Sequence, residues 1–543
     1  MSKALRRFLF RGLSQKKTYK AIKYTGVGVV GGIATLASTP VLSNCSEDNT
    51  VINKANGALR FLRSIKIGLW ISLDYYFSSM GLDESCTNYK FMMSRIHQRS
   101  AERILRGCLV NGGSYIKLGQ GLCSMGHILP EEYIETLRCL QDKCLKREEG
   151  ELQKIFQKDF GKDPEELFES IDKEPIAAAS IAQVYKAVTK EGDPVAVKVQ
   201  YIDLQQRFTS DVVTIKMLLR IAGILHPKFD FSWIINDMEN ALKQELDFIN
   251  EGLNGERCAR DLQHLKYVHV PKIYWDYTSL RVLVTEFIDG YKISDVEHLK
   301  NENYSLTDLN NKLFEAFGHQ IFQTGFVHGD PHPGNVLVRK VNGNAQLVLL
   351  DHGLYQEVSA EDRTALSHFW KAIVFRDHRN MMKYSNELGV KDYELFAEIL
   401  TQAPLKAQGF QLKVRLSEED LQRMTEFAKN RFDTIMVCLK EMPRSLLLVI
   451  RNLNTIRAIA DQHGNPIDRY TTLARTATKS VYGVQSSIVK TIVNVPASMY
   501  FEIVLQIRKF GRWFTKKTYK LLYYFGLAPD IEMITSKMRA VNI

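Results

Sequence analysis

The chain has few cysteines for its length, and their spacing is not that of a metal site. Eight cysteines are spread over 543 residues without a Cys-x2-Cys pair, and the two nearest, Cys139 and Cys144, lie five positions apart. Structural zinc sites need closely spaced cysteine pairs, and disulfide frameworks belong to secreted chains. The sequence therefore predicts reduced thiols in a protein that is not secreted.

Nucleic-acid-binding motifs are also missing, although the chain carries a net charge of +11. The positive charge is spread unevenly, and the first 46 residues contain eight Lys or Arg and no Asp or Glu. Basic chain ends of this kind are attracted to anionic lipid headgroups. We therefore expect a membrane surface as a partner, and no nucleic acid.

The N-terminal segment has the pattern of a mitochondrial targeting sequence. Within residues 1–24, Leu5, Phe8, Leu9 and Leu13 share one helical face, and arginines lie toward the other side. An apolar run of 18 residues follows, but it begins too far from the start of the chain for a secretory signal. Residues 25–43 are a candidate membrane anchor near the lower length limit, or a segment that is cleaved or buried.

The most informative stretch runs from His328 to Asn335, and Asp351 opens an Asp-His-Gly turn sixteen residues later. The spacing Asp-x4-Asn, followed by a second acid, is that of a kinase catalytic loop. In such a loop Asp330 would orient the acceptor hydroxyl, while Asn335 and Asp351 would hold magnesium against the phosphates of ATP. Apolar runs on both sides predict that the acids leave the ends of buried strands.

Two other interpretations of this stretch stay open from the sequence alone. His, Asp, Pro and Gly form turns, so the cluster could be an ordinary connection between strands. His328, Asp330 and His332 could instead ligate zinc or a pair of metal ions, although such sites need further ligands at defined spacing.

Lys198 lies in a segment that alternates as a buried strand does, on the face opposite its two valine neighbours. A kinase needs a lysine at such a position to bind the nucleotide phosphates. The expected partner of this lysine is an acid on the neighbouring helix. Glu251 is the first choice for that acid and Glu245 the second.

The glycine-rich loop that covers the ATP phosphates in protein kinases is missing. Its place, 18 to 21 residues before Lys198, is taken by Ala177, Ala178, Ala179 and Ser180. Glycines let backbone amides close over phosphates at positive φ, which alanines resist. We therefore expect a stiffer phosphate loop and altered nucleotide chemistry.

Three further features of protein kinases are missing. Gly329 stands where kinases carry an arginine, no Ala-Pro-Glu follows Asp351 within fifty residues, and His352 replaces the phenylalanine of Asp-Phe-Gly. The first two absences argue against phosphate-controlled docking of peptides. The third leaves the metal ligand in place but removes the usual phenylalanine switch.

Over about residues 60–480 the chain resembles the UbiB/aarF family of atypical kinase-like proteins, and especially its mitochondrial members. The motifs that carry the resemblance are Lys117 to Gln120, Leu140 to Asp142, Ala177 to Ser180, Glu245 to Asp247 and His328 to Asn335. The resemblance implies an α+β, two-lobed protein-kinase-like fold with an N-terminal helical extension. It also implies that the Lys117–Gln120 segment covers the active site and blocks peptide substrates, with ATP and magnesium as cofactors.

The Lys117–Gln120 segment is expected to be regulatory. Lys117 and Gln120 lie at i and i+3, on one helix face, so both could reach a common acid such as Glu245 or Asp247. A pair of ordinary surface side chains is the alternative.

The composition divides the chain into six expected segments. These are a targeting sequence (1–24), an anchor candidate (25–43), the helical extension (58–165), a small lobe (166–289), a large lobe (290–480) and a basic, aromatic tail (481–543). Glu286 lies in the expected hinge, where backbone groups would meet adenine. In the tail, residues 508–520 hold six basic residues among aromatic ones, as an interfacial helix or a soluble basic face does.

Two functions remain open on this basis. One is a mitochondrial atypical kinase or ATPase, associated with the inner membrane, that binds Mg-ATP and serves lipid or quinone homeostasis and mitochondrial membrane maintenance. It would act on a small or lipid-like molecule, near mitochondrial membrane proteins, rather than as an ordinary protein kinase. The other is a nucleotide-binding pseudokinase scaffold without phosphoryl transfer. The presence of Lys198, Asp330, Asn335 and Asp351 favours the enzyme, and the alanine loop keeps the scaffold open.

Overall fold

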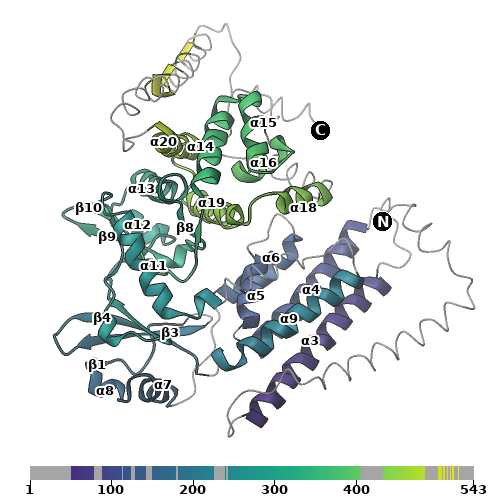
Figure 1. The fold of residues 1–543 in the computed structure, drawn as a ribbon, viewed down its shortest axis with the longest axis vertical. Helices are drawn as coiled ribbons and strands as arrows, with labels where there is room; N and C mark the ends of the chain where they lie inside the picture. Colours follow the sequence, from purple (N-terminus) through teal and green to yellow (C-terminus); the bar gives the residue numbers. More distant parts are fainter. Residues whose placement is uncertain are drawn as a thin grey trace, which may run out of the picture. The chain divides into compact units, whose positions relative to one another are not determined.

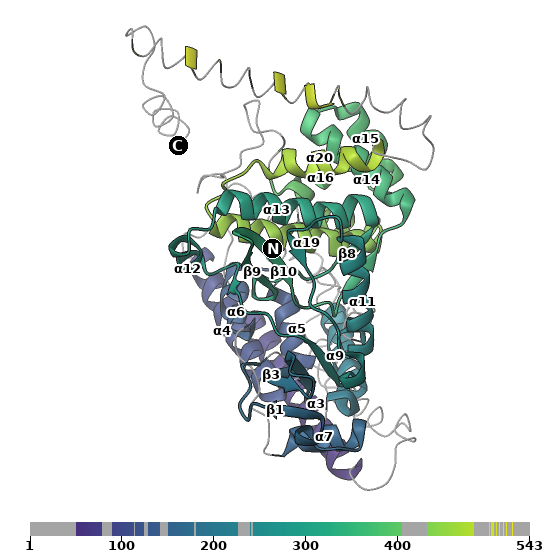
Figure 2. The same cartoon turned by 90° about the vertical axis from the view of Figure 1, so that its left-hand side faces the viewer.

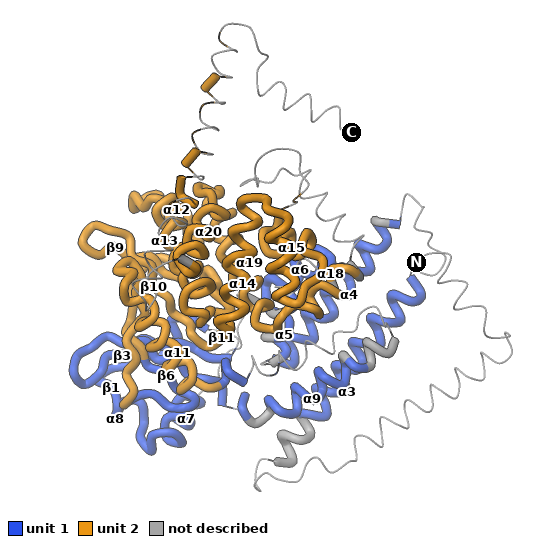
Figure 3. Tube along the Cα trace, turned by 45° about the horizontal axis from the view of Figure 1, so that its top comes forward, with its two compact units in different colours: residues 1–246, 277–284 blue, residues 247–276, 285–543 orange. Residues whose placement is uncertain are grey.

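The computed structural model describes residues 50–78, 89–112, 114–123, 129–141, 150–178, 181–202, 204–225, 243–403, 405 and 432–482, with isolated positions at 239 and between 499 and 524. The targeting sequence, the anchor candidate 25–43, Ala179, Ser180 and most of residues 508–520 lie outside this part of the chain. Two compact units are present: residues 1–246 with 277–284, and residues 247–276 with 285–543 (Figure 3). The segment boundaries expected from composition stay predictions.

The first unit contains a group of helices that includes the Lys117–Gln120 segment. Its elements are α3 (Thr50–Ser78), α4 (Tyr89–Asn111), α5 (Ser114–Cys123), α6 (Glu131–Arg138), the 3-10 turn η1 (Cys139–Gln141) and α9 (Leu204–Leu225). Helices α3, α4 and α9 run beside one another (Figure 1). The ion pair between Arg60 Nε and the buried carboxylate of Asp211, at 2.9 Å, joins α3 to α9.

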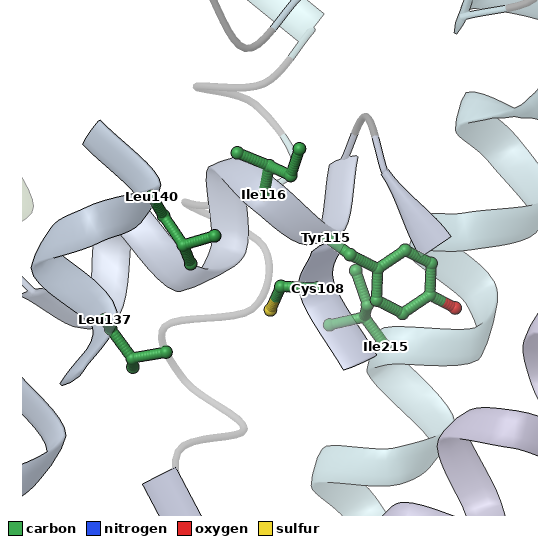
Figure 4. Packing of buried hydrophobic residues seen from close by; sticks show 6 residues of the cluster. All are labelled: Cys108, Tyr115, Ile116, Leu137, Leu140 and Ile215. Carbon is green, nitrogen blue, oxygen red and sulfur yellow. The ribbon is translucent and has the colours of Figure 1, made fainter. Parts of the chain in front are cut away.

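Apolar side chains from α4, α5, α6, η1 and α9 meet in one core of this unit (Figure 4). Its buried members are Cys108, Tyr115, Ile116, Leu137, Leu140 and Ile215. Burial of such side chains is worth about 1.5–3 kcal/mol each, so this core fixes the position of the short helix α5.

The first unit also contains an antiparallel sheet preceded by two helices. Its elements are α7 (Glu151–Phe160), α8 (Pro164–Leu167), β1 (Phe168–Ile171), β2 (Ala177–Ala178), β3 (Ala182–Thr189), β4 (Pro194–Gln200) and β6 (Val282–Glu286), of which Thr285 and Glu286 belong to the second unit. The strand order is β1-β3-β4-β6, and β2 pairs with β3. The turn between β3 and β4 uses Gly192 at φ 88°, a conformation that glycine adopts without strain.

The second unit contains the strands on both sides of the catalytic loop. Its elements up to the last strand are α11 (Phe248–Asp261), β5 (Val268–His269), η3 (Trp275–Tyr277), β7 (Tyr291–Lys292), α12 (Val296–Asn301), α13 (Leu306–His319), the π-helical turn η4 (Gln320–Thr324), β8 (Phe326–His328), η5 (Pro333–Asn335), β9 (Val336–Val341), β10 (Asn344–Leu349) and β11 (Tyr355–Glu357). The strands among them form one sheet of order β5-β10-β9-β7 and a two-stranded sheet of β11 and β8.

Helices complete the second unit. They are α14 (Ala360–Phe375), α15 (His378–Glu387), α16 (Tyr393–Thr401), α18 (Phe432–Glu441), α19 (Arg444–Gln462) and α20 (Arg469–Tyr482). Helix α19 lies beside α13 (Figure 2) and buries Leu446, Val449 and Ile456 at helical spacing. The predicted α+β class is confirmed. None of the described helices combines the length and apolar character that a membrane span requires.

Candidate active site

The candidate catalytic loop, His328 to Asn335, lies between two buried strands, as the sequence predicts. The chain leaves η4 through Gly325, at φ 75°, enters β8, and passes through η5 into β9. Asp351 follows β10, whose last residues are buried. Asn335 and Asp351 come together at these strand ends, because Asn335 Nδ2 donates to Asp351 Oδ2 at 3.2 Å.

His328 ties the loop to the Asp351 turn. Its Nδ1 accepts the amide proton of Asp330 at 3.1 Å, and its Nε2 lies 2.7 Å from the carbonyl oxygen of Asp351. Because Nδ1 accepts, the proton of the imidazole lies on Nε2 and is donated to that carbonyl. Burial lowers the pKa of His328, so the ring stays neutral at neutral pH.

Two hydrogen bonds fix the orientation of the Asp351 carboxylate. Its Oδ1 accepts the amide proton of Gly353 at 3.0 Å, and Oδ2 takes the bond from Asn335. The two side chains thus bring an amide and a carboxylate together, which is the oxygen chemistry that magnesium prefers. Water and phosphate oxygens would supply the remaining ligands of such an ion.

The zinc interpretation of the histidines is wrong. His328 Nδ1 is bonded to the backbone of the loop, His328 Nε2 to the backbone of Asp351, and His332 Nδ1 accepts the amide proton of Gly334 at 3.2 Å. Within the part of the chain that the structure describes, no group of three or more His, Cys, Asp and Glu side chains is arranged to hold a metal ion.

Helix α19 contributes two residues that sequence reasoning missed. Arg451 Nη2 donates to Asp330 Oδ2 at 2.7 Å, and Asn452 Nδ2 donates to the carbonyl oxygen of His328 at 2.8 Å. Both residues follow the loop by more than a hundred positions and lie in an amphipathic helix without a motif. No local signal in the sequence could have identified them.

His352 takes the place of the kinase phenylalanine as a buried, fully bonded ring. Its Nε2 lies 3.0 Å from the Leu349 carbonyl oxygen, and its Nδ1 lies 2.9 Å from the Tyr355 hydroxyl. The ring also lies against α11, where a Cβ added to Gly255 would meet His352 Cδ2 at 3.3 Å. Asn254 Nδ2 on the same helix donates to the His352 carbonyl at 3.1 Å, so α11 is fixed to this turn.

The acids expected near the phosphates have different places. Glu251 is buried on α11, in the second unit, while Lys198 lies in the first unit, so their pairing stays a prediction. Asp247 is the N-cap of α11, because its side chain accepts the amide proton of Asn250 at 3.0 Å. Glu245 is partly buried and belongs to the first unit, whose first segment ends at Leu246.

Lys198 is placed on its strand as predicted. In β4 the valines on either side of it are buried, while Lys198 is partly exposed. It lies opposite Val184 of β3, and the same residue of β3 pairs with Ala177 of β2. Ala177 and Ala178 are exposed, and the rest of the predicted phosphate loop lies outside the described residues.

Glu286, in the expected hinge, is bound within the second unit. Its Oε2 lies 2.8 Å from His269 Nε2, and Arg339 lies 3.6 Å from its other oxygen. Its backbone amide donates to the Lys272 carbonyl at 2.8 Å, so this amide is already used inside the protein. Just beyond it, Ile288 packs on Leu337 of β9, on Val348 of β10 and on Leu350.

The Lys117–Gln120 segment forms part of α5, and the side chain of Lys117 is not among those described. Gln120 Nε2 donates to the Leu140 carbonyl at 2.9 Å. A Cβ on Gly119 would collide with Leu140 Cδ1 and lie 3.3 Å from Cys108 Sγ. The segment therefore packs on Leu140, and its regulatory role stays a prediction.

Comparisons of the sequence with known proteins identify relatives that are named as kinases. A family model described as ABC1 atypical kinase-like domain matches residues 139–385. The chain is 37% identical over 512 residues to the probable serine/threonine-protein kinase abkD of Dictyostelium discoideum, covering 93% of this chain and 71% of that protein. It is 36% identical over 408 residues to AarF domain-containing protein kinase 1 of Gallus gallus, covering 74% and 78%. A solved structure of an Rv3197–erythromycin complex from Mycobacterium tuberculosis is similar at a TM-score of 0.43 and 19% identity, over 69% of this chain and 94% of that one.

Proposed function

We propose a function from one premise: this chain belongs to the ABC1 atypical kinase-like family. We infer that it is a Mg-ATP-dependent phosphotransferase or ATPase that acts on a small or lipid-like molecule rather than on proteins. The observation that carries the proposal is the meeting of Asn335 and Asp351, at 3.2 Å, beside the loop that presents Asp330.

The residues present fit a magnesium–nucleotide group. Asn335 and Asp351 would hold the ion, which when bound would neutralise charge on the phosphates. Asp330 would accept a hydrogen bond from the attacking hydroxyl or water and take its proton. Ile288 and the β9 and β10 side chains packed on it would offer an apolar surface for the base. Lys198 would bind phosphate oxygens as a point charge.

What the loop lacks argues against peptide substrates and so supports a small or lipid-like acceptor. Gly329 leaves no arginine to read a phosphorylated activation segment, and a Cβ there would meet Leu354 Cγ at 2.8 Å, so a larger residue has no room. Helix α5, packed on Leu140, is the candidate cover that would exclude peptides.

Phosphate release by the purified full chain tests the proposal directly. Wild-type protein should release phosphate from Mg-ATP, and anionic vesicles should increase the rate if the acceptor is lipid-like. Asp330→Asn should bind nucleotide normally and turn over about 10²–10⁴-fold more slowly, the range that general base catalysis contributes. Equal release by the two proteins would contradict the assignment of Asp330.

The pseudokinase scaffold is the second candidate, favoured by the exposed alanines Ala177 and Ala178 where kinases carry glycines. It predicts nucleotide binding and a nucleotide-dependent change in hydrogen exchange, without phosphate release from wild-type protein. The same assay therefore separates the two functions.

We place this activity in mitochondria, at the inner membrane and near its proteins, in lipid or quinone homeostasis. The acid-free, basic first 46 residues support an import signal. Deleting residues 1–24 should leave a tagged protein in the cytosol, because import receptors recognise amphipathic basic helices. Unchanged mitochondrial localisation of the deletion would refute the assignment.

A further inference from the structure

Helix α19 holds the catalytic loop through two consecutive side chains. Arg451 donates to the carboxylate of Asp330 at 2.7 Å, and Asn452 donates to the carbonyl of His328 at 2.8 Å. Asn452 is completely buried. Arg451 and Asp330 are 26% and 32% exposed, so this ion pair lies where solvent and an acceptor can reach it.

The helix that carries these residues is itself well fixed. Val449, Leu453 and Ile456 are buried on its inner side, and the Asn310–His463 hydrogen bond of 2.8 Å ties its end to α13. An exposed ion pair on mobile chains is worth little. A guanidinium on a packed helix instead sets the direction of the carboxylate it binds.

The loop supplies no cation of its own to do this. Residues 328–335 contain no Lys or Arg. The backbone of Asp330 is held by His328 Nδ1 at 3.1 Å, and its side chain is held by Arg451. Both ends of the residue are thus fixed, one by the loop and one by a helix that follows 121 positions later.

We propose that Arg451 is the positioning residue for Asp330. The proposal rests on the proposed function, in which Asp330 is the general base. The guanidinium binds Oδ2, and a carboxylate has a second oxygen with lone pairs for the acceptor O–H. In the transfer step the acceptor oxygen forms the new bond to the γ-phosphorus of ATP, its proton passes to Asp330, and the bond to the β–γ bridging oxygen breaks with ADP leaving.

Kinetics of the full chain test this role. Arg451→Ala should lower kcat about 100-fold, the effect of misplacing a catalytic group by about 1 Å, and change KM for Mg-ATP less than about 2-fold. Arg451→Lys should recover part of the loss. Methylguanidinium should restore activity to Arg451→Ala but not to Asp330→Asn. The control is Arg379→Ala on α15, an exposed arginine in the same unit, which should match wild type.

A second measurement does not depend on turnover. Hydrogen exchange of the peptide 326–335 should be at least about 10-fold faster in Arg451→Ala, because the loop opens more often when the ion pair is lost. The double variant Arg451→Ala/Asp330→Asn should exchange no faster than the faster single variant, since both remove one interaction. Arg379→Ala should leave the peptide protected.

The outcomes separate the two proposals. Wild-type kcat in Arg451→Ala, a raised kcat, or additive effects on loop exchange would each overturn the positioning role. A different outcome is that the two variants show coupled effects on loop exchange while the wild-type protein releases no phosphate. This result would refute the proposed enzyme, and Arg451 would still position Asp330. Coupled exchange with the kcat loss and its rescue supports both.

Discussion

Replacing Asp351 by asparagine is the sharpest test of the magnesium assignment. The Asp351 carboxylate accepts one hydrogen bond at each oxygen, from Gly353 N at 3.0 Å and from Asn335 Nδ2 at 3.2 Å. A carboxylate only accepts hydrogen bonds, whereas an amide has one accepting oxygen and a donating nitrogen. Asp351→Asn therefore removes the negative charge. The amide nitrogen of the new side chain would also face the donating Nδ2 of Asn335, unless the Asn335 amide flips.

The carboxylate of Asp351 would make a charged contact with the ion that an amide cannot match, and the strength of such contacts sets the expected loss. A hydrogen bond to a charged group contributes about 1.5–3 kcal/mol, so we expect nucleotide binding to weaken by about 2 kcal/mol, or about 30-fold in Kd. At a nucleotide concentration of about 100 times the wild-type Kd, binding stabilises wild type by about 2.7 kcal/mol and the variant by about 0.9 kcal/mol.

Thermal-shift titrations with Mg-ATP and Mg-ADP, with EDTA as the metal-free arm, measure this difference. The shift of Asp351→Asn should fall to about a third of the wild-type shift, and Lys198→Ala should show a loss of similar size. Asp172→Asn removes the same charge at an exposed position and should behave as wild type. A full magnesium-dependent shift in Asp351→Asn would show that the metal binds elsewhere.

Three further predictions concern the cover, its packing and acid stability. Lys117→Ala should change ADP-versus-ATP selectivity and raise self-phosphorylation, measured by nucleotide affinity and radiolabel incorporation; wild-type behaviour in both would leave the segment an ordinary helix. Gly119→Ala should lower the free energy of unfolding in urea by about 1–3 kcal/mol, because its Cβ collides with Leu140; Gly68→Ala on α3, where nothing lies within 4 Å, is the neutral control. Burial lowers the pKa of His319 from 6.5 to about 4, so the unfolded chain binds its proton first and stability falls as pH drops through that window. His319→Gln should flatten this fall, and an equal pH slope in both proteins would disprove it.

The sequence predicts those features that depend on local pattern. Alternation placed Lys198 opposite two buried valines, and the apolar run before Asp351 is a buried strand end. The family resemblance, which rested on short motifs, was confirmed by relatives that cover most of the chain. These successes share a cause, because strand periodicity and motif spacing are set by neighbours in the chain.

The contacts that decide the chemistry of the loop could not be predicted in this way. Arg451 reaches Asp330 only because α19 packs beside β8. Glu286 at the end of β6 forms a hydrogen bond with His269 of β5, 17 positions earlier in the chain. Likewise Gln120 bonds to the backbone of Leu140, 20 residues on. Each partner depends on tertiary packing, for which a single sequence carries no periodic signal.

The histidine of the Asp-His-Gly turn should hold this turn in one conformation more firmly than a phenylalanine would. A phenylalanine at 352 could leave its pocket at the cost of apolar burial alone, whereas His352 would also leave two buried groups, the Leu349 carbonyl and the Tyr355 hydroxyl, without their bonds. Burial raises the pKa of Tyr355 far above its usual value, so the hydroxyl keeps the proton it donates to the ring. Gly255 lets α11 lie against the same ring, and Asn254 donates a hydrogen bond to the His352 carbonyl. The helix that carries Glu251 is therefore fixed relative to the Asp351 turn. His352→Phe should therefore free the turn, and faster hydrogen exchange of residues 349–355 with unchanged exchange in β9 is the expected result. Unaltered exchange in that peptide would mean that the apolar contacts of the ring, and not its hydrogen bonds, hold the turn.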